Sequence, residues 1–179
     1  TIQLWATQSG NLMNVLPTQF RSIRSMTFHP DGRTLALGSL NGAVELWNVS
    51  SRRSIWCNNR QLEGITLVDF NPDGSLLAQA AGATVELIKL ARKKSVALRT
   101  NQVAPLTAIA FSPDGQTLAT ASGPTLMLWN VLKRKPLTVP VTRHQQPIRA
   151  LAFTPNGRML ISGGSDRLLN LWQTAERPE

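Results

Sequence analysis

The sequence predicts an all-β fold built from one repeated unit, and three observations lead to this prediction. A phenylalanine followed by a turn motif recurs four times, as FHPDG at 28–32, FNPDG at 70–74, FSPDG at 111–115 and FTPNG at 153–157. Short apolar segments recur in step with it and end at Trp5, Trp47, Ile88, Trp129 and Trp172. No stretch shows a sustained 3.6-residue apolar period between good caps, which argues against helices.

The spacing of the turn motifs sets the length of the repeat. From residue 28 to 70, 111 and 153 the successive intervals are 42, 41 and 42 residues. Repeats of this length are typical of solenoids or propellers. In the first repeat, the apolar segments 23–28, 34–39, 43–47 and 53–56 are bounded by Gly, Pro, Asn, Asp or Ser, as strands are. Four strands per repeat favour a propeller over stacked pairs of helices.

Proline and glycine assign roles to the turns and to the last strand of each repeat. In x-P-D-G, proline presets φ at the second position of a type I turn and glycine suits the fourth, so this motif joins the first two strands. Pro136 and Pro140 fall in the predicted fourth strand of their repeat. Because proline is tolerated mainly at the edge of a sheet, we expect the fourth strand to be outermost.

The last repeat, RHQQPIRALAF followed by TPNGRMLISGGSDRLLNLW, resembles the WD-repeat family of β-propellers. In that family each repeat of about 40 residues supplies a four-stranded antiparallel blade. The resemblance implies a propeller segment of about four repeats, and it places His144, Ser162, Asp166 and Trp172 in the family's structural hydrogen-bond network. A buried indole N–H and a turn carboxylate both need partners, and an imidazole and a hydroxyl can link them.

The other repeats depart from this pattern. The position of His144 is taken by Gln19, Gln61 and Gln102, and the position of Asp166 by Asn41, Gly82 and Gly123. We therefore expect the network to be complete only in the last repeat. The second repeat also has Ile88 in place of the tryptophan, so we expect its blade to be the least rigid.

The repeats divide the whole chain, which we expect to form one domain. Residues 1–16 supply the third and outer strands of a preceding blade, and 17–57, 58–98 and 99–141 form repeats 1 to 3. Residues 142–174 form repeat 4, which lacks its outer strand, and 175–179 form a polar tail. Because the chain starts with a third strand and a full ring of this family has about seven blades, we expect a piece of a longer propeller. The ring can close in three ways: the parent chain contains further blades, two copies of the chain meet, or the first outer strand completes the last blade of a small ring.

Composition and motifs exclude several classes of protein. No apolar run approaches the roughly 18 residues that cross a bilayer, so no membrane span is expected. Cys57 is the single cysteine, which excludes an internal disulfide and favours the cytoplasm. Two histidines and one cysteine give no metal-ligand pattern, and no nucleophile has a credible base. We expect no catalytic residues, no metal and no cofactor.

Charge is concentrated at one position of the repeat. The chain has 19 Lys and Arg against 10 Asp and Glu, a net charge of +9. Eight of the cations fall in the predicted turns between third and fourth strands of three repeats, namely Arg52, Arg53, Arg92, Lys93, Lys94, Lys133, Arg134 and Lys135. We expect a basic patch there, able to attract nucleic acid or another anionic surface. Charged hairpin tips that serve only solubility are the alternative.

The resemblance also indicates where a partner would bind. In WD-repeat proteins the face around the mouth of the channel, built by the turns between second and third strands and the loops into the first strands, commonly receives partners. The candidate residues there are Phe20, Arg21, Arg24, Thr66, Thr107, Gln146 and Arg149. The expected function is a non-catalytic platform for protein partners. The alternatives are electrostatic binding through the basic turns, or packing on other domains of a parent chain; the oligomeric state stays open.

Overall fold

A computed structural model of the chain describes residues 1–59, 64, 66–98 and 104–173. Within these residues every regular element is a β-strand, and the strands form antiparallel sheets. The expected all-β propeller segment is therefore confirmed. The expectations for Gln61, Gln102 and the tail 175–179 lie outside the described residues.

The strands group into a leading hairpin and four blades. The leading hairpin consists of β1 (Ile2–Trp5) and β2 (Leu12–Leu16). Blade 1 consists of β3 (Ile23–Phe28), β4 (Thr34–Ser39), β5 (Val44–Asn48) and β6 (Arg53–Asn58). Blade 2 consists of β7 (Thr66–Phe70), β8 (Leu76–Ala81), β9 (Thr84–Lys89) and β10 (Lys94–Leu98).

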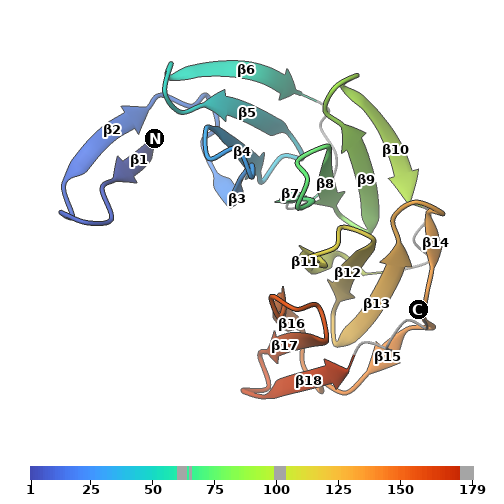
Figure 1. Cartoon of the computed structure of the whole chain (residues 1–179). Helices are drawn as coiled ribbons and strands as arrows, with labels where there is room; N and C mark the ends of the chain where they lie inside the picture. Colours follow the sequence, from blue (N-terminus) through green and yellow to red (C-terminus); the bar gives the residue numbers. More distant parts are fainter. Residues whose placement is uncertain (60–63, 65, 99–103, 174–179) are drawn as a thin grey trace.

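Blade 3 consists of β11 (Leu106–Phe111), β12 (Thr117–Ser122), β13 (Thr125–Asn130), β14 (Lys135–Pro136) and β15 (Val141–Thr142). Blade 4 consists of β16 (Ile148–Phe153), β17 (Met159–Gly164) and β18 (Leu169–Gln173). The blades follow one another along an arc, with β3, β7, β11 and β16 on its inner side and the fourth strands on its outer side (Figure 1).

The outermost strand of blade 3 is interrupted where the prolines lie. Both β14 and β15 pair with β13, at Trp129 with Pro136 and at Leu126 with Val141. Between these two pieces the hydroxyl of Thr138 accepts the Leu128 N–H at 3.2 Å, in place of a backbone carbonyl. This is the physical consequence of proline in an outer strand.

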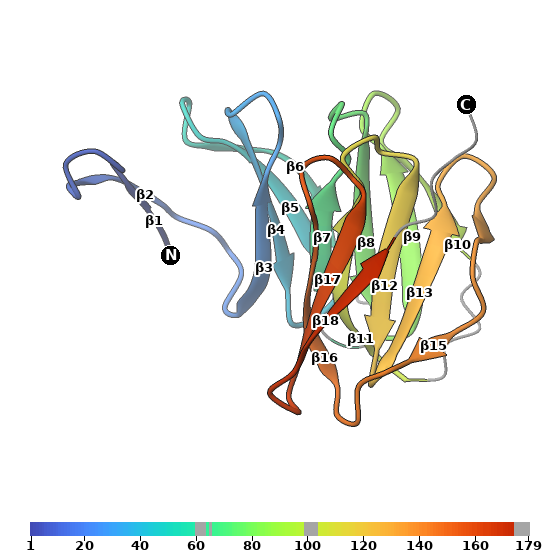
Figure 2. The ribbon, with the colours of Figure 1, turned by 60° about the horizontal axis from the view of Figure 1, so that its bottom comes forward.

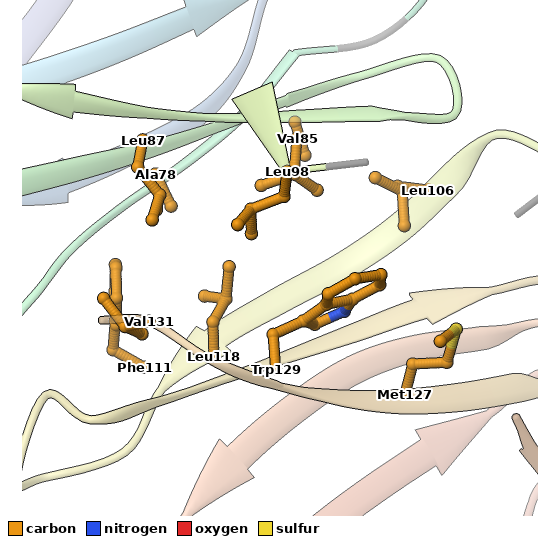
Figure 3. Packing of buried hydrophobic residues seen from close by; sticks show 11 residues of the cluster. Ala78, Val85, Leu87, Leu98, Leu106, Phe111, Leu118, Met127, Trp129 and Val131 are labelled. Carbon is orange, nitrogen blue, oxygen red and sulfur yellow. The ribbon is translucent and has the colours of Figure 1, made fainter. Parts of the chain in front are cut away.

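The hydrophobic core lies between blades rather than inside any one of them. Figure 3 shows the largest cluster, in which Ala78, Val85 and Leu87 of blade 2 face Leu118 and Trp129 of blade 3. Further clusters join the leading hairpin to blade 1, blade 1 to blade 2, and blade 3 to blade 4. Blades 1, 2 and 3 are buried between two neighbours, which is how propeller blades gain a core. The leading hairpin and blade 4 pack on one described neighbour each, and Trp5, Leu169 and Leu171 are exposed.

The turns between second and third strands come in two lengths. Blades 2 and 3 use two-residue turns, since Ala81 pairs with Thr84 and Ser122 with Thr125. Blades 1 and 4 use three-residue turns, at 40–42 and 165–167, whose last residues, Gly42 and Arg167, have φ of 86° and 66°. A left-handed third residue is the usual geometry of a three-residue hairpin loop.

The two ends of the blades form two distinct faces (Figure 2). One, here called the proline-turn face, carries the turns 29–32, 71–74, 112–115 and 154–157 together with the turns between third and outer strands. The opposite end carries the turns between second and third strands and the loops into the first strands. Candidate residues for binding therefore divide between these two faces.

Neighbouring proline turns touch one another. The His29 Nε2–H of blade 1 donates to the Gly74 carbonyl of blade 2 at 3.0 Å, and its ring packs edge-on against Phe70 with centroids 4.9 Å apart. The Asp31 N–H donates to His29 Nδ1 at 3.0 Å, which orients the ring. His29 therefore connects two blades, a role that its sequence position did not reveal.

Candidate functional site

Three first strands carry a β-bulge at the same position. The paired residues step from Ile23 to Ser25 in β3, from Leu106 to Ala108 in β11 and from Ile148 to Ala150 in β16. The residues left outside the ladder are Arg24, Thr107 and Arg149. A bulge turns its extra residue out of the regular alternation of the strand. All three lie at the end of the blades opposite the proline turns, which we call the bulge face.

The equivalent residue in blade 2 corrects one expectation from the sequence. Thr66 pairs in regular register with Ala81 and is fully buried. Its backbone lies so close to Gly38 of blade 1 that a Cβ at Gly38 would overlap with the Thr66 carbonyl oxygen. Thr66 therefore belongs to the contact between blades and is closed to a partner.

Arg24 and Arg149 are both exposed, and a hydrogen bond holds Arg149 in a defined orientation. The Nε–H of Arg149 donates to Ser165 Oγ at 2.8 Å, and the Ser165 N–H donates to the Pro147 carbonyl at 2.9 Å. The turn of blade 4 thus fixes the stem of the guanidinium. An oriented guanidinium can bind a carboxylate through two parallel N–H groups.

A groove of about 460 Å³ lies on the same face in blade 1. Phe20 and Arg21 line one side, and Leu40 and Asn41, from the turn between β4 and β5, line the other. The Leu40 N–H donates to the Ser22 carbonyl at 3.0 Å, which ties the two sides together. The sequence pointed to Phe20 and Arg21 and placed Leu40 in a turn of the same face, and in the structure Leu40 is 43% exposed. Gln146 is exposed in the loop before β16 and does not line this groove.

In blade 4 four side chains form one continuous chain of hydrogen bonds. Asp166 accepts from His144 Nδ1–H at 2.9 Å, and His144 Nε2 accepts from the Ser162 hydroxyl at 2.8 Å. Ser162 in turn accepts from Trp172 Nε1–H at 2.8 Å. His144 and Ser162 are buried, so each link satisfies a polar group that water does not reach. Removing one link leaves its buried partner without a hydrogen bond.

Asp166 anchors this chain at the turn. Desolvation raises the pKa of its carboxyl, but hydrogen bonds from His144 and from the backbone N–H groups of Leu168 and Gln145 outweigh it and hold the pKa below its ordinary value. The guanidinium of Arg143 lies 5.1 Å from the centre of the Trp172 ring at the other end of the chain. These contacts fix the architecture of blade 4, and none of them leaves a group aimed at a ligand.

The remaining blades keep only parts of the network. In blade 3 Thr120 replaces the serine and accepts from Trp129 Nε1–H at 2.9 Å. In blade 1 Leu37 stands at this position, and the Trp47 Nε1–H has no partner among the described residues. In blade 2 Gln79 stands there and donates to the Gly42 carbonyl of blade 1 at 2.9 Å. The two-residue turns of blades 2 and 3 also leave no middle position for a carboxylate.

The eight cations lie where the repeat pattern predicts, in the hairpins β5–β6, β9–β10 and β13–β14, and all are exposed. We call these turns the basic hairpins. They share the proline-turn face (Figure 2). Arg52, Lys93 and Arg134 occupy equivalent positions and have φ of 57°, 49° and 55°. Glycine is the residue favoured at such angles, and sequence reasoning did not anticipate this feature.

A cavity of about 650 Å³ opens on the proline-turn face between blades 2 and 3. Leu76, Leu87 and Val96 line it from blade 2, and Leu132 and Arg134 line it from the basic hairpin of blade 3. Leu132 is 86% exposed at the tip of that hairpin. No sequence motif marks this cavity, because its walls come from segments of two repeats.

Two carboxylates accept hydrogen bonds from outside their own strand pairs. Asp69 accepts the Phe111 N–H of blade 3 at 2.9 Å; desolvation raises its pKa, although the hydrogen bonds from Phe111 and Phe70 act in the opposite direction. Glu45 is buried and accepts from the Thr18 hydroxyl at 3.0 Å. Both acidic side chains have structural partners. Glu45 also lies opposite Cys57 in the β5–β6 ladder, where desolvation and the charge of Glu45 raise the pKa of the thiol and so disfavour the thiolate.

The described residues contain neither a metal-ligand cluster nor a membrane-spanning helix. No three His, Cys, Asp or Glu side chains gather in a way that would hold a metal ion in this part of the chain. Across the same residues there is no helix of the length and apolar character that spanning a membrane requires.

Comparison with known proteins agrees with this architecture. The sequence profile of the family described as "WD domain, G-beta repeat" matches residues 10–48, 95–130 and 134–173, which is more than half of the chain. The segments 10–48 and 95–130 reach from an outer strand into the third strand of the next blade, so a sequence unit is offset from a blade.

One relative is Echinoderm microtubule-associated protein-like 2 of Rattus norvegicus, with 33% identity over 81 residues. The match covers 43% of this chain and 12% of that relative. The matched profile, the four-stranded antiparallel blades and the hydrogen-bond chain of blade 4 lead to one conclusion: the chain belongs to the WD-repeat family.

Proposed function

We propose that this chain is a protein-binding platform whose partner docks on the bulge face. WD40 repeats in general mediate protein interactions and are in general non-catalytic scaffolds. The observation that carries the proposal is the bulge repeated at Arg24, Thr107 and Arg149, since bulges are enriched where a side chain is re-aimed for function. The rat relative is named as microtubule-associated, which supports a protein as the class of partner.

The chemistry of the face suggests what the partner presents. Arg24 and Arg149 offer guanidinium groups suited to carboxylates, and the groove beside Phe20 and Leu40 offers an apolar wall. A segment with Asp or Glu side chains and one apolar side chain complements both features. Aromatic and arginine residues are also the types that dominate binding energy at protein interfaces.

Charge reversal on the face tests the platform. The variant Arg24→Glu with Arg149→Glu is compared with Arg33→Glu with Arg158→Glu. The second pair reverses two exposed arginines that directly follow proline turns, immediately before β4 and β17. Affinity purification from nuclease-treated lysate, with quantitative mass spectrometry, should recover a protein with the unmodified chain and the control pair but not with the first pair. The melting temperature should stay the same in all three. A partner retained by the first pair, or lost equally with the control pair, contradicts the proposal.

A second candidate function is electrostatic binding of an anionic partner through the basic hairpins. The observation that favours it is the cation at a left-handed backbone position in all three hairpins. Such binding weakens steeply as salt rises. Titration with poly-glutamate at low and high salt tests it, and an affinity that does not change with salt contradicts it.

A third alternative is that both faces pack on other domains of a longer chain. It predicts that neither face recruits an external partner.

A further inference from the structure

We infer that the basic hairpins dock on the surface of an anionic membrane, with lipid headgroups as their counter-charges and Leu132 entering the interface. This inference rests on the second function proposed above and names the partner class for that site. It concerns a peripheral contact of the proline-turn face.

The first argument is the backbone at Arg52, Lys93 and Arg134. Left-handed φ is unfavourable for residues with a Cβ and nearly free for glycine. All three hairpins nevertheless place a cation there, at the point of each turn that faces solvent. Arg167, in the turn between β17 and β18 on the bulge face, also has a left-handed φ, so what distinguishes the basic hairpins is that three such cations lie at equivalent positions on one face.

The second argument is the distribution of the charges. The three hairpins belong to consecutive blades and lie at the same end of the molecule (Figure 2), so their cations are spread over a broad face rather than gathered in a groove. A flat anionic surface contacts all of them at once, and each Lys or Arg adds to the attraction. The carboxylates of Asp31, Asp73 and Asp114 share this face but are fewer than the eight cations, and each accepts hydrogen bonds within its own turn.

The third argument is Leu132. It is 86% exposed at the tip of the β13–β14 hairpin, directly before Lys133 and Arg134, whereas the equivalent residues of the other hairpins are the small Ser50 and Ala91. An apolar side chain flanked by cations is the arrangement that interfacial membrane segments use. The cavity beside Leu132 has an apolar part, formed by Leu76, Leu87 and Val96. Asp73 and Asp114 also line it, so the contact with the membrane is assigned to the tip of the hairpin and not to the cavity.

Nucleic acid fits the same face less well. The hairpin segments 49–53, 90–94 and 131–135 contain no aromatic residue. Proteins that bind single strands combine cations with aromatic side chains on which the bases stack. The basic hairpins supply only the cations.

The experiment is flotation of the full chain with phosphatidylcholine vesicles that contain about 30% phosphatidylserine, beside vesicles of phosphatidylcholine alone. The test variant carries Arg52→Gly, Lys93→Gly and Arg134→Gly, because glycine suits the backbone at all three positions. Lys93 Nζ also donates to the Ile55 carbonyl of blade 1 at 3.5 Å, so the melting temperature of the variant is measured to check that its fold is intact. The matched control removes three cations from the opposite face, as Arg21→Gln, Arg24→Gln and Arg149→Gln. Leu132→Ser, with Leu137→Ser as its control, tests the apolar contact.

The unmodified chain and the bulge-face control should float with the anionic vesicles and not with neutral ones. The glycine variant should bind about tenfold more weakly or worse, and Leu132→Ser should bind more weakly than Leu137→Ser. Binding to poly-glutamate or to an oligonucleotide without binding to vesicles overturns the membrane inference and leaves anion binding standing. If the chain binds neither the anionic vesicles nor poly-glutamate nor the oligonucleotide, both the membrane inference and the second candidate function are overturned. Vesicle binding that the glycine variant retains also overturns the inference.

Discussion

Equivalent tryptophans of this propeller segment differ in the partners of their indole N–H groups. Trp172 and Trp129 donate to hydroxyls. In blade 1 Leu37 occupies the position of those hydroxyls, and the buried N–H of Trp47 has no partner among the described residues. An unsatisfied buried donor carries a desolvation penalty of about 1–3 kcal/mol. Blade 1 therefore holds its tryptophan by packing alone.

This difference predicts unequal costs for the same substitution. Trp129→Phe removes a hydrogen bond and leaves Thr120 without its donor, whereas Trp47→Phe removes only the unsatisfied N–H and some contact area. We expect Trp129→Phe to lower the free energy of unfolding by about 1 kcal/mol more than Trp47→Phe. Urea titrations followed by circular dichroism measure both, and equal losses would show that the hydrogen bond to Thr120 does not contribute.

The carboxylate of Asp31 makes stability depend on pH. Desolvation raises its pKa, but hydrogen bonds from the backbone N–H groups of Arg33 and Thr34 and from the Thr34 hydroxyl outweigh it and lower the pKa to about 2. Because the folded pKa lies below the unfolded one, the contribution is complete above about pH 4 and disappears as pH falls toward 2.

Asp31→Asn should remove this part of the pH dependence without removing the turn. Asn156 occupies the equivalent position in blade 4 and accepts from the Arg158 N–H at 3.1 Å, so asparagine fits the turn. We expect the urea midpoint of the variant to fall less steeply than that of the unmodified chain between about pH 4 and pH 2. Parallel curves over this range would contradict the assignment.

At the level of elements, the hairpins between third and outer strands combine a favourable charge pattern with an unfavourable backbone. Arg134 lies in a turn and has φ of 55°. Arg53 of blade 1, one position further along its own hairpin, is already in a strand, as the first residue of β6. Glycine is favoured at the first kind of position and disfavoured in a strand. The two positions therefore respond to glycine in opposite directions.

We predict that Arg134→Gly raises the free energy of unfolding by up to about 1 kcal/mol and that Arg53→Gly lowers it. Both changes remove one exposed cation, so the comparison separates backbone conformation from charge. Thermal unfolding at moderate salt is the measurement. Destabilisation by Arg134→Gly would mean that the side chain makes a contact that outweighs the strain of its backbone.

The elements were predictable from sequence because each depends on neighbouring residues. Apolar segments and the Pro-Asp-Gly turn between them predicted β3 and β4 with the bounds that the structure has. Pro136 predicted that the fourth strand of its repeat is the outermost one. The chain from Asp166 to Trp172 followed from the family pattern. The bulge at Arg24 was not predictable, because it depends on which residues of two strands pair. Thr66 was wrongly assigned to the surface for the same reason, since the blade beside it covers its side chain.

For the whole molecule, stability depends on contacts between blades, and those contacts link residues about one repeat apart. The bond from His29 to Gly74, that from Phe111 to Asp69 and the shared apolar clusters all have this separation. A sequence shows no local sign of such pairs, which is why the cavity between blades 2 and 3 was also missed. Loss of one contact should therefore weaken the joint between two blades.

Gly74→Ala should destabilise the protein more than Gly32→Ala. Both glycines end a proline turn with positive φ, but a Cβ at Gly32 meets nothing within 4 Å, whereas a Cβ at Gly74 would overlap with the His29 ring. Gly32→Ala costs only the backbone strain of about 1–2 kcal/mol, and Gly74→Ala adds to this strain the displacement of the His29 ring. Urea unfolding of both variants and of Gly74→Ala with His29→Ala measures the difference. If the double variant is no more stable than Gly74→Ala, the overlap is not the cause.

The offset between sequence unit and blade bears on how such a chain can change over generations. A unit such as 10–48 begins with an outer strand of one sheet and ends within the next sheet. Each inherited segment therefore links two neighbouring sheets covalently. Duplication of one segment in a gene would insert the first three strands of a new sheet. The outer strand of that new sheet would be supplied by the beginning of the next segment. Unequal recombination can therefore lengthen or shorten the array without leaving a broken sheet at the point of exchange.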